Sequence, residues 1–345
     1  MFEPTIKDVA KMCGVGVSTV SRAINDHPDI NPETKERIMD AIRESGYVPN
    51  DSARNLKRVD AKAIAVLVKG IANPFFTSMI TVIEQECKKR HYSMELSHIE
   101  ADEDEVDVAQ KVVKEKRLRG IIFLGGLFSH SEEKLKKLTV PFVFSTAGSV
   151  PEHISRKQYS SISVDDRRES LKMVDYLIRS GHTRIAILVA EAMEESVGRL
   201  RLDGYCDALR AHGIEVDPGL ICQTEDGLSH FSMENGYRST KRLLQCGGQF
   251  TALYAVSDAL AIGALRALYE AGLRVPQDIS LAGYDGIDMT DYTVPSLTTI
   301  RQPVEEMAKD TTRLLFDIIA KKTKHQHITY EAELLVREST AKIPE

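Results

Sequence analysis

Two stretches near the start of the chain decide its architecture: residues 5–25 read TIKDVAKMCGVGVSTVSRAIN, and residues 46–56 read GYVPNDSARNL. The first stretch predicts two short helices joined by a tight turn. Thr5 can cap the first helix, because Asp8 three residues later completes a relaxed form of the capping box. Gly14 then ends that helix.

The apolar residues of these two helices recur at the three- and four-residue spacing of a single buried face. Val15 stands in the turn, where it can fill the gap between two crossing helices. A helix, a glycine-containing turn and a second helix in about twenty residues form the helix-turn-helix pattern. The positions predicted to be buried are Ile6, Val9, Ala10, Val20, Ala23 and Ile24.

A third helix follows, with Asn31 as its N-cap, Pro32 at its first position and Gly46 as its stop. With these residues in place, the chain resembles the LacI/GalR family of bacterial transcription repressors. The motifs that carry the resemblance are DVA at 8–10, VGVSTVSR at 15–22, GYVPN at 46–50 and ARNL at 53–56. The resemblance continues through essentially the whole chain.

The resemblance implies that Val17, Ser18 and Arg22 read DNA bases in the major groove. Arg can hold guanine through two hydrogen bonds, whereas Val can only meet an apolar surface such as a thymine methyl group. Other polar residues of the head would contact phosphate, which positions the protein without specifying sequence. These residues are Thr5, Thr19, Ser21 and Asn25. The alternative is an ordinary polar helix face.

One residue departs from the family pattern. Gly16 stands where the family usually has serine, so the chain lacks a hydroxyl cap and an expected phosphate contact at the start of the second helix. We expect this difference to lower affinity for the operator without changing the fold.

Residues 49–60 resemble the family's hinge helix and linker, which follow a DNA-binding head at residues 1–48. A segment of one to two turns is too short to be a stable helix alone in water. The resemblance implies that two copies pair on DNA and that Leu56 wedges into the minor groove; the alternative for Leu56 is core packing. The expected DNA contacts here are Asn50, Ala53, Arg54, Leu56 and Lys57.

Composition excludes several classes of protein. The 345 residues are 42% hydrophobic and 28% charged, which is ordinary for a globular protein, and the net charge of −6 does not by itself indicate nucleic acid. No secretory signal and no membrane span are expected. The five cysteines are scattered without metal-ligand spacing, so we expect reduced thiols in a cytoplasmic protein with no metal and no cofactor.

From residue 61 onward, short apolar runs alternate with amphipathic helical patterns, which predicts parallel sheets covered by helices on both faces. Two such series predict an α/β core of two doubly wound lobes, similar to the type I periplasmic-binding-protein fold. Predicted strands are 64–68, 93–96, 120–124, 141–144, 161–164, 185–189, 220–223, 252–256 and 279–283. Predicted helices are 74–89, 106–116, 132–138, 170–179, 202–211, 236–244, 262–271 and 307–319.

This effector-binding and dimerisation core is expected to span residues 61–340. Lobe 1 would comprise residues 61–162 and 293–322, and lobe 2 residues 163–292 and 323–340. The segment at 297–303 is expected to cross back to lobe 1. A cleft should lie at the carboxyl ends of the strands, where α/β sheets bind ligands.

Residues that follow strand ends are the candidates for binding an effector in this cleft. Arg201 and Phe231 match family positions that grip the ligand and cover it with a ring. Arginine and aspartate can hold vicinal hydroxyls, while an aromatic ring covers the apolar face of a sugar or base. The candidates are Asn73, Phe75, Asp165, Arg201, Phe231, Ser257 and Asp285. Alternatively, Arg201 and Asp285 form a structural ion pair, and the two phenylalanines belong to the core.

Together these features predict a dimeric transcriptional repressor that binds a pseudo-palindromic operator in double-stranded DNA and responds to a small molecule. The family favours a sugar or sugar phosphate as effector, then a nucleobase, with a phosphoprotein corepressor as a third alternative. The short tail after residue 339 favours a homodimer over a tetramer. A solute-binding protein would not need residues 5–56, and a sugar-processing enzyme would need a catalytic motif. None is present, and His182 is expected to be a structural partner at a helix end.

Overall fold

The computed structural model describes residues 4–24, 27–47, 62–100, 102–126, 131–147, 154–190, 196–247 and 249–343. The chain divides into two compact units, Met1–Ala61 and Lys62–Glu345. The hinge and linker predicted at 49–60 lie outside the described residues.

The first unit contains helices α1 (Ile6–Met12), α2 (Val17–Ile24) and α3 (Pro32–Ser45). Val9, Val20 and Ile38 are fully buried where the three helices meet. The Asn31 side chain accepts hydrogen bonds from the backbone N–H groups of residues 33 and 34, and Gly46 ends α3 at φ +66°. The predicted helix-turn-helix head is therefore confirmed.

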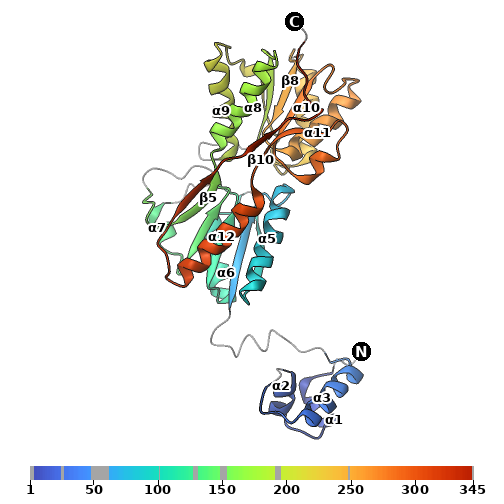
Figure 1. Cartoon of the computed structure of the whole chain (residues 1–345), viewed down its shortest axis with the longest axis vertical. Coiled ribbons are helices and arrows are strands. Elements are labelled where there is room, and N and C mark those ends of the chain that lie inside the picture. The colour runs from blue at the N-terminus through green and yellow to red at the C-terminus, as the bar shows by residue number, and fades with distance from the viewer. Residues whose placement is uncertain are drawn as a thin grey trace. The chain divides into compact units, whose positions relative to one another are not determined.

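The second unit has two lobes, each built on one six-stranded sheet (Figure 1). The sheet of lobe 1 has the order β11-β5-β4-β3-β1-β2, and that of lobe 2 has the order β12-β10-β9-β8-β6-β7. All pairs are parallel except β10 with β12. The strands of lobe 1 are β1 (Ala63–Lys69), β2 (Ser93–Ile99), β3 (Gly120–Leu124), β4 (Phe142–Ser145), β5 (Ser160–Val164) and β11 (His327–Tyr330). Those of lobe 2 are β6 (Ile185–Val189), β7 (Ile221–Gln223), β8 (Ala252–Ala255), β9 (Ser280–Asp285), β10 (Thr298–Arg301) and β12 (Glu333–Leu335).

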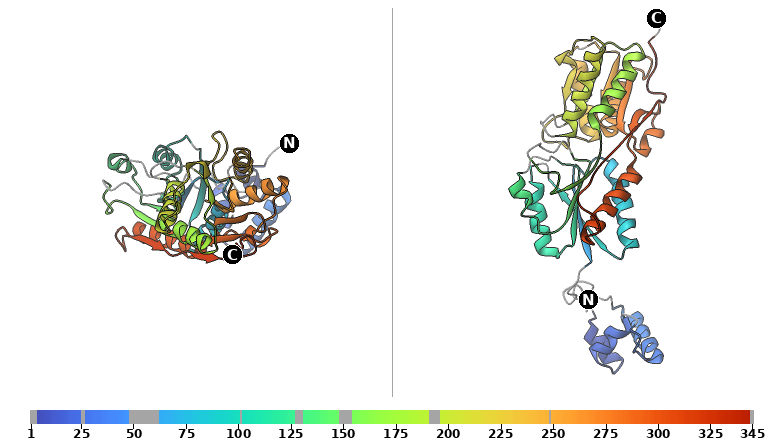
Figure 2. Two further views of the ribbon diagram at one scale, coloured as in Figure 1. Left: turned by 90° about the horizontal axis from the view of Figure 1, so that it is seen from above. Right: turned by 60° about the vertical axis from the view of Figure 1, so that its left-hand side comes forward.

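Both faces of the lobe 1 sheet are covered, as its continuous apolar strands predict. Successive side chains of β1 point to opposite faces: Ile64, Val66 and Val68 join one core cluster, and Ala63, Ala65 and Leu67 join another. Helices α5 (Phe75–Lys89) and α12 (Val304–Ile319) pack on the first face. Helices α6 (Glu105–Lys116) and α7 (Glu132–Leu135) cover the other (Figure 2).

In lobe 2, helices α8 (Asp166–Arg179) and α9 (Val197–Ala211) form one packed pair, and α10 (Met233–Gln245) and α11 (Asp258–Glu270) form the other (Figure 1). Glycine permits the close approach within each pair. A Cβ atom at Gly204 would lie 2.1 Å from the carbonyl oxygen of Arg167, and one at Gly236 would lie 2.2 Å from that of Leu260. Helix-to-helix backbone contact therefore fixes the position of each pair.

The strand pairing differs from the predicted lobe boundaries in two places. β10 lies within 293–322, the range predicted for lobe 1, but it pairs with β9 in the lobe 2 sheet. β11 lies within 323–340, the range predicted for lobe 2, but it pairs with β5 in lobe 1. The prediction was wrong here because neither strand carries an apolar run: β10 buries two threonines, and β11 is half-buried and pairs with a strand far earlier in the sequence.

The chain consequently passes between the lobes three times: between β5 and α8, between β10 and α12, and between β11 and β12. No helix among the described residues is long and apolar enough to cross a membrane.

Candidate functional site

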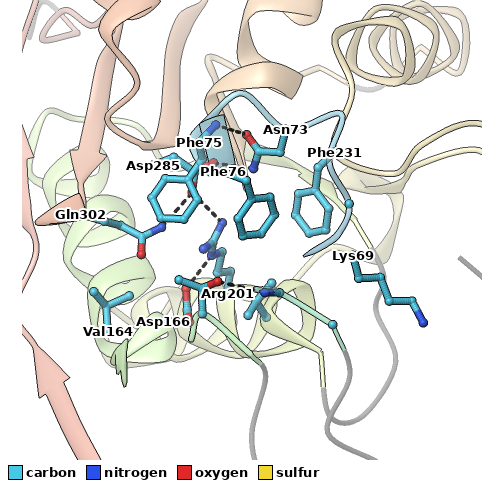
Figure 3. Close-up of a pocket in the computed structure, with 15 residues that line it drawn as sticks. Lys69, Asn73, Phe75, Phe76, Val164, Asp166, Arg201, Phe231, Asp285 and Gln302 are labelled. Carbon is cyan, nitrogen blue, oxygen red and sulfur yellow. Dashed lines mark hydrogen bonds and ion pairs between the residues drawn. The ribbon is translucent and has the colours of Figure 1, made fainter. Parts of the chain in front are cut away.

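A pocket lies between the two lobes of the second unit, at the carboxyl ends of the strands (Figure 3). It contains about 590 Å³ of empty space, part of it open to solvent. Lobe 1 contributes Lys69 at the end of β1 and Phe75 at the start of α5, and lobe 2 contributes Arg201 and Asp285. The further lining residues are Gly70, Asn73, Phe76, Gly125, Gly126, Thr146, Val164, Asp166, Val197, Phe231 and Gln302.

The guanidinium of Arg201 is the centre of a buried polar cluster at this pocket. Its Nε donates to Asp166 Oδ1 at 2.8 Å, and its Nη1 donates to the Val256 carbonyl at 2.5 Å and to Asp285 Oδ1 at 3.4 Å. The ring of Tyr284 lies 3.7 Å from the guanidinium carbon, which allows a cation–π interaction. No described residue occupies the Nη2 donors.

Arg201 is only 5% exposed, so its charge depends on these partners. Burial alone would lower the pKa of the guanidinium, but the nearby Asp166, Tyr284 and Asp285 raise it overall. A buried ion pair gives little net stability, although removal of one partner is costly because the other charge stays buried. Arg201 is therefore held as a fixed cation with two of its three nitrogen atoms committed to the protein.

Asp285 connects the lobes through its carboxylate. Asn73 Nδ2 of lobe 1 donates to Oδ2 at 3.0 Å, and Gln302 Nε2 donates to Oδ1 at 2.9 Å. Gln302 belongs to the segment between β10 and α12, one of the three crossings. Burial raises the pKa of Asp285 to about 6, against the opposing effects of Arg201 and the two amide donors. The backbone of Asp285 has φ +117°, a strained value for a residue other than glycine.

Asp258 stabilises the loop that follows Asp285. Its Oδ2 accepts from the backbone N–H of Gly286 at 2.6 Å and of Ile287 at 2.9 Å, and its Oδ1 accepts from Thr299 Oγ1 at 2.6 Å. The side chain is fully buried, and burial raises its pKa well above the ordinary value. Asp258 thus supports the strained backbone at Asp285 and does not line the pocket.

Aromatic rings form another part of the pocket wall. Phe75 and Phe76 meet edge to face, with ring centroids 5.5 Å apart, and Phe231 is half-buried (Figure 3). Asn73 Oδ1 accepts from the backbone N–H of Phe75 at 3.1 Å, so one side chain binds the first N–H of α5 and also Asp285. The position of the two phenylalanines is therefore tied to the polar cluster.

Five of the seven residues predicted for the effector lie at this pocket: Asn73, Phe75, Arg201, Phe231 and Asp285. The other two cap helices. Asp165 is exposed and accepts from the N–H of Arg168 at the start of α8, while Ser257 is buried and accepts from the N–H of Leu260 at the start of α11.

Sequence reasoning missed Asp166 and Gln302. Asp166 directly follows Asp165, and only the helical geometry of α8 decides which of the two carboxylates faces Arg201. Gln302 lies in the segment correctly expected to cross between lobes, and its position at that crossing is a signal that could have identified it.

In the head, the three residues predicted to read bases lie on the outer face of α2. Val17 is 41% exposed, and Ser18 and Arg22 are exposed. Thr19 and Ser21 are half-buried on the same helix. Gly16 does not have a left-handed backbone, and the nearest atom to a Cβ placed there would be Ser18 Oγ at 3.5 Å. The fold therefore leaves room for a serine at this position.

Thr5 is exposed, but its polar groups are already engaged. Its Oγ1 and its backbone N donate to Asp8 Oδ2 at 2.6 and 2.8 Å. A phosphate contact by the hydroxyl would have to replace this bond. The remaining predicted DNA contacts lie outside the described residues: Asn25, Asn50, Ala53, Arg54, Leu56 and Lys57.

His182 has a structural position. It is 3% exposed, its Nδ1 bonds Thr251 Oγ1 at 2.9 Å, and its Nε2 bonds the Ala341 carbonyl at 3.0 Å. Within the described ranges, no three His, Cys, Asp or Glu residues form a group that could hold a metal ion.

The polar cluster predicts a large stability cost for Arg201→Met. The substitution leaves Asp166 and Asp285 buried without their counter-charge, so the free energy of unfolding should fall by about 3–5 kcal/mol in urea denaturation. Arg199→Met on the same helix is the matched control, since Arg199 pairs with Asp203 at 2.9 Å on the surface. That control should cost about 0.5 kcal/mol or less. Similar losses in both variants would refute a special role for the buried cation.

The raised pKa of Asp285 predicts a pH dependence of stability. Between about pH 4 and 6 the Asp285 carboxyl is ionised in the unfolded chain but still protonated in the folded chain. The contribution of Asp285 to the free energy of unfolding is therefore lost as the pH rises through this range. Relative to Asp285→Asn, the wild type should lose roughly 2–3 kcal/mol of unfolding free energy from pH 4 to pH 7, because one pKa unit corresponds to about 1.4 kcal/mol. Urea denaturation of both proteins across this range tests it. A constant difference would mean that Asp285 is already ionised in the fold at pH 4.

Comparison with known proteins places this geometry in a family. Residues 5–50 match bacterial regulatory proteins of the lacI family, and residues 174–340 match the periplasmic binding protein-like domain. The HTH-type transcriptional regulator MalR of Clostridium butyricum is 38% identical over 336 residues, which cover 97% of this chain and 98% of that protein. The HTH-type transcriptional repressor CytR of Escherichia coli (strain K12) is 32% identical over 347 residues, with 99% and 97% covered.

Solved structures of other regulators match the fold of this chain over similar lengths. The lac repressor dimer bound to operator and the anti-inducer ONPF superposes with a TM-score of 0.74 at 26% identity, covering 99% of this chain and 100% of that one. The complex of the transcriptional regulator CelR with cellobiose superposes with a TM-score of 0.70 at 29% identity, covering 98% of this chain and 100% of that one. A LacI family regulator from Enterococcus faecium with bound ribose superposes with a TM-score of 0.70 at 31% identity, covering 82% of this chain and 100% of that one. The chain therefore belongs to the LacI family of bacterial regulatory proteins and is a DNA-binding transcriptional regulator, not an enzyme.

Proposed function

We propose that the protein is a dimeric repressor that binds a pseudo-palindromic operator and is controlled by a carbohydrate bound between its lobes. The observation that carries the proposal is the buried cluster of Arg201, Asp166 and Asp285 beside three phenylalanine rings in the interlobe pocket. A fixed cation and carboxylates beside apolar ring faces match the two kinds of surface that a sugar presents.

The unused atoms of the cluster suit a pair of neighbouring hydroxyl groups. The Nη2 donors of Arg201 and the Oδ2 acceptor of Asp166 take no hydrogen bond from described residues, although both side chains line the pocket. A sugar diol could accept from the first and donate to the second, while Phe231 covers its C–H face. The cellobiose and ribose complexes of related regulators support a carbohydrate as ligand.

The exposed face of α2 would read the operator. Val17, Ser18 and Arg22 would contact base edges, with Thr19, Ser21 and Asn25 on phosphates. Residues of the predicted hinge segment would also contact the operator, as in the family pattern: Asn50, Ala53, Arg54, Leu56 and Lys57. The operator complex of the lac repressor dimer supports this arrangement.

Coupling between ligand and DNA would arise at the lobe crossings. Val164, Asp166 and Gln302 line the pocket and stand at two of the three crossings. A ligand held by groups of both lobes favours one relative position of the lobes over another, and its effect on operator affinity is limited by that difference in binding free energy.

A second copy would cover an apolar surface of lobe 2. Tyr292 is 85% exposed, Val294 is 90% exposed and Tyr269 is 73% exposed. Tyr269 and Val294 share a shallow depression with Ile262, Leu265, Leu273, Val275 and Pro295. Arg266, Arg274 and Gln277 also line this depression, and exposed apolar side chains bordered by polar ones are typical of an interface between proteins. Two-fold pairing would match the two-fold symmetry of the operator.

The direct test is a carbohydrate panel with two readouts, thermal unfolding of the full chain and its binding to duplex DNA selected for high affinity. A ligand at one hundred times its Kd should add about 2.7 kcal/mol to the free energy of unfolding and should change DNA affinity. Stabilisation without a change in DNA affinity would refute the coupling. A panel without any stabilisation would contradict the carbohydrate assignment and favour a nucleobase or a phosphoprotein corepressor.

Arg22→Ala should cost about 1–3 kcal/mol of operator binding and relax base preference at one position of the half-site. Fluorescence anisotropy with operators changed at single base pairs measures both effects. Arg43→Ala is the control, because it removes the same charge from α3, where Arg43 pairs with Asp40. Equal losses on every sequence would show that Arg22 contacts only phosphate.

The apolar surface predicts that Tyr292→Ser combined with Val294→Ser raises the Kd of the dimer at least about tenfold, since buried apolar area is lost from the interface. Sedimentation equilibrium measures this, with Leu96→Ser as control because Leu96 is 45% exposed on lobe 1. An unchanged dimer Kd in the double variant would place the interface elsewhere.

A further inference from the structure

Lys69 of the pocket is held by an acidic partner behind the pocket wall. Its Nζ lies 3.2 Å from Glu105 Oε1, and the two side chains are 11% and 7% exposed. The same Nζ donates to the Glu103 carbonyl at 3.0 Å. The backbone of Gly126 packs against the carboxylate, since a Cβ atom there would lie 2.7 Å from Glu105 Oε1. Lys69 therefore has a fixed position and a compensated charge.

The positive charges of the described pocket lining are compensated by acidic residues. Among the described lining residues, the cationic side chains are Lys69 and Arg201. Glu105 opposes the first, and Asp166 and Asp285 oppose the second. Three carboxylates thus stand against two cations.

Two helix starts at the pocket, those of α5 and α8, add little attraction for an anion. Asn73 Oδ1 accepts the first N–H of α5, and α8 begins with two acidic residues, Asp165 and Asp166. At the start of α9, which has no acidic residue in its first turn, Ser196 Oγ accepts from the backbone N–H of Arg199. A phosphate group normally requires uncompensated cations or free backbone N–H groups at a helix start.

A phosphorylated ligand would have to compete with Glu105 for Lys69. Success would separate the buried Glu105 carboxylate from the charge of Lys69 and would place a second negative group close to it, which opposes binding. A neutral polyol needs neither change, because it can use hydrogen bonds to Arg201 and Asp166 as they stand.

We propose that the pocket selects an uncharged carbohydrate and that the Lys69–Glu105 ion pair excludes its phosphorylated form. This inference rests on the proposed carbohydrate-dependent function and narrows its ligand class. It makes Glu105, which does not line the pocket, a residue that determines specificity.

Isothermal titration calorimetry of the full-length protein with matched sugars tests the inference. The probes are glucose, ribose and cellobiose, each beside its monophosphate with the phosphate on the terminal hydroxymethyl group. At least one neutral sugar should bind, and its phosphate should bind about 100-fold more weakly or worse, as expected for uncompensated like charges. A phosphate that binds equally or more tightly overturns the inference but leaves the carbohydrate function intact. Absence of binding by every probe overturns both.

Glu105→Gln removes the negative charge beside Lys69 without a change in side-chain size. The preference for the neutral sugar over its monophosphate, measured as the ratio of the two affinities, should fall at least about tenfold. The main cause should be tighter binding of the sugar phosphate. Glu103→Gln is the matched control, since it removes the same charge from an exposed side chain that contacts Lys69 only through its backbone carbonyl. That control should leave the ratio unchanged. An unchanged ratio in Glu105→Gln refutes the role of the pair, and if this variant does not fold, the wild-type ratio alone decides.

Discussion

A single buried cation, the guanidinium of Arg201, is the constraint around which the sensor core is arranged. The Arg201 side chain is almost fully buried, so its charge must be surrounded by hydrogen-bond acceptors from several parts of the chain. Asp166 comes from the first lobe crossing, Val256 follows β8, and Asp285 ends β9. The need to compensate one charge therefore brings together segments that are more than one hundred residues apart in sequence, and it does so where the lobes meet.

The surroundings of Asp285 suggest how a ligand could move the lobes. The carboxylate accepts from Asn73 of lobe 1 and from Gln302 at a crossing, on a backbone held in a strained conformation. Asn73 also accepts from the first N–H of α5, so the hydrogen bond between lobes and the start of a lobe 1 helix share one side chain. A ligand that competes for these groups would change the contact between lobes and the position of α5 together. Strain at such a position is often found where a protein has two states.

The sequence predicted most of the fold because its signals are local. Helix caps such as Asn31, continuous apolar strands such as residues 64–68 and their alternation with helices were sufficient for the head and both lobes. The lobe boundaries failed at β10 and β11, because neither strand has an apolar run and β11 pairs with the distant β5. At the site, Arg201 followed from the family resemblance and Asp285 from its place at a strand end. The choice between Asp165 and Asp166 depends on the direction of the side chain at the start of α8, which no pattern specifies. The compensation of Lys69 by Glu105 joins residues 36 apart and was also invisible in sequence.

The central claim is that the interlobe pocket and the DNA-binding head are energetically coupled. Coupling is reciprocal: if effector changes operator affinity by some factor, operator must change effector affinity by the same factor. The decisive measurement is calorimetric titration of the effector into the free protein and into its complex with operator duplex. We expect two different effector affinities, whose ratio equals the ratio of operator affinities measured with and without effector. Identical effector affinities in the free protein and in the operator complex would contradict the coupling.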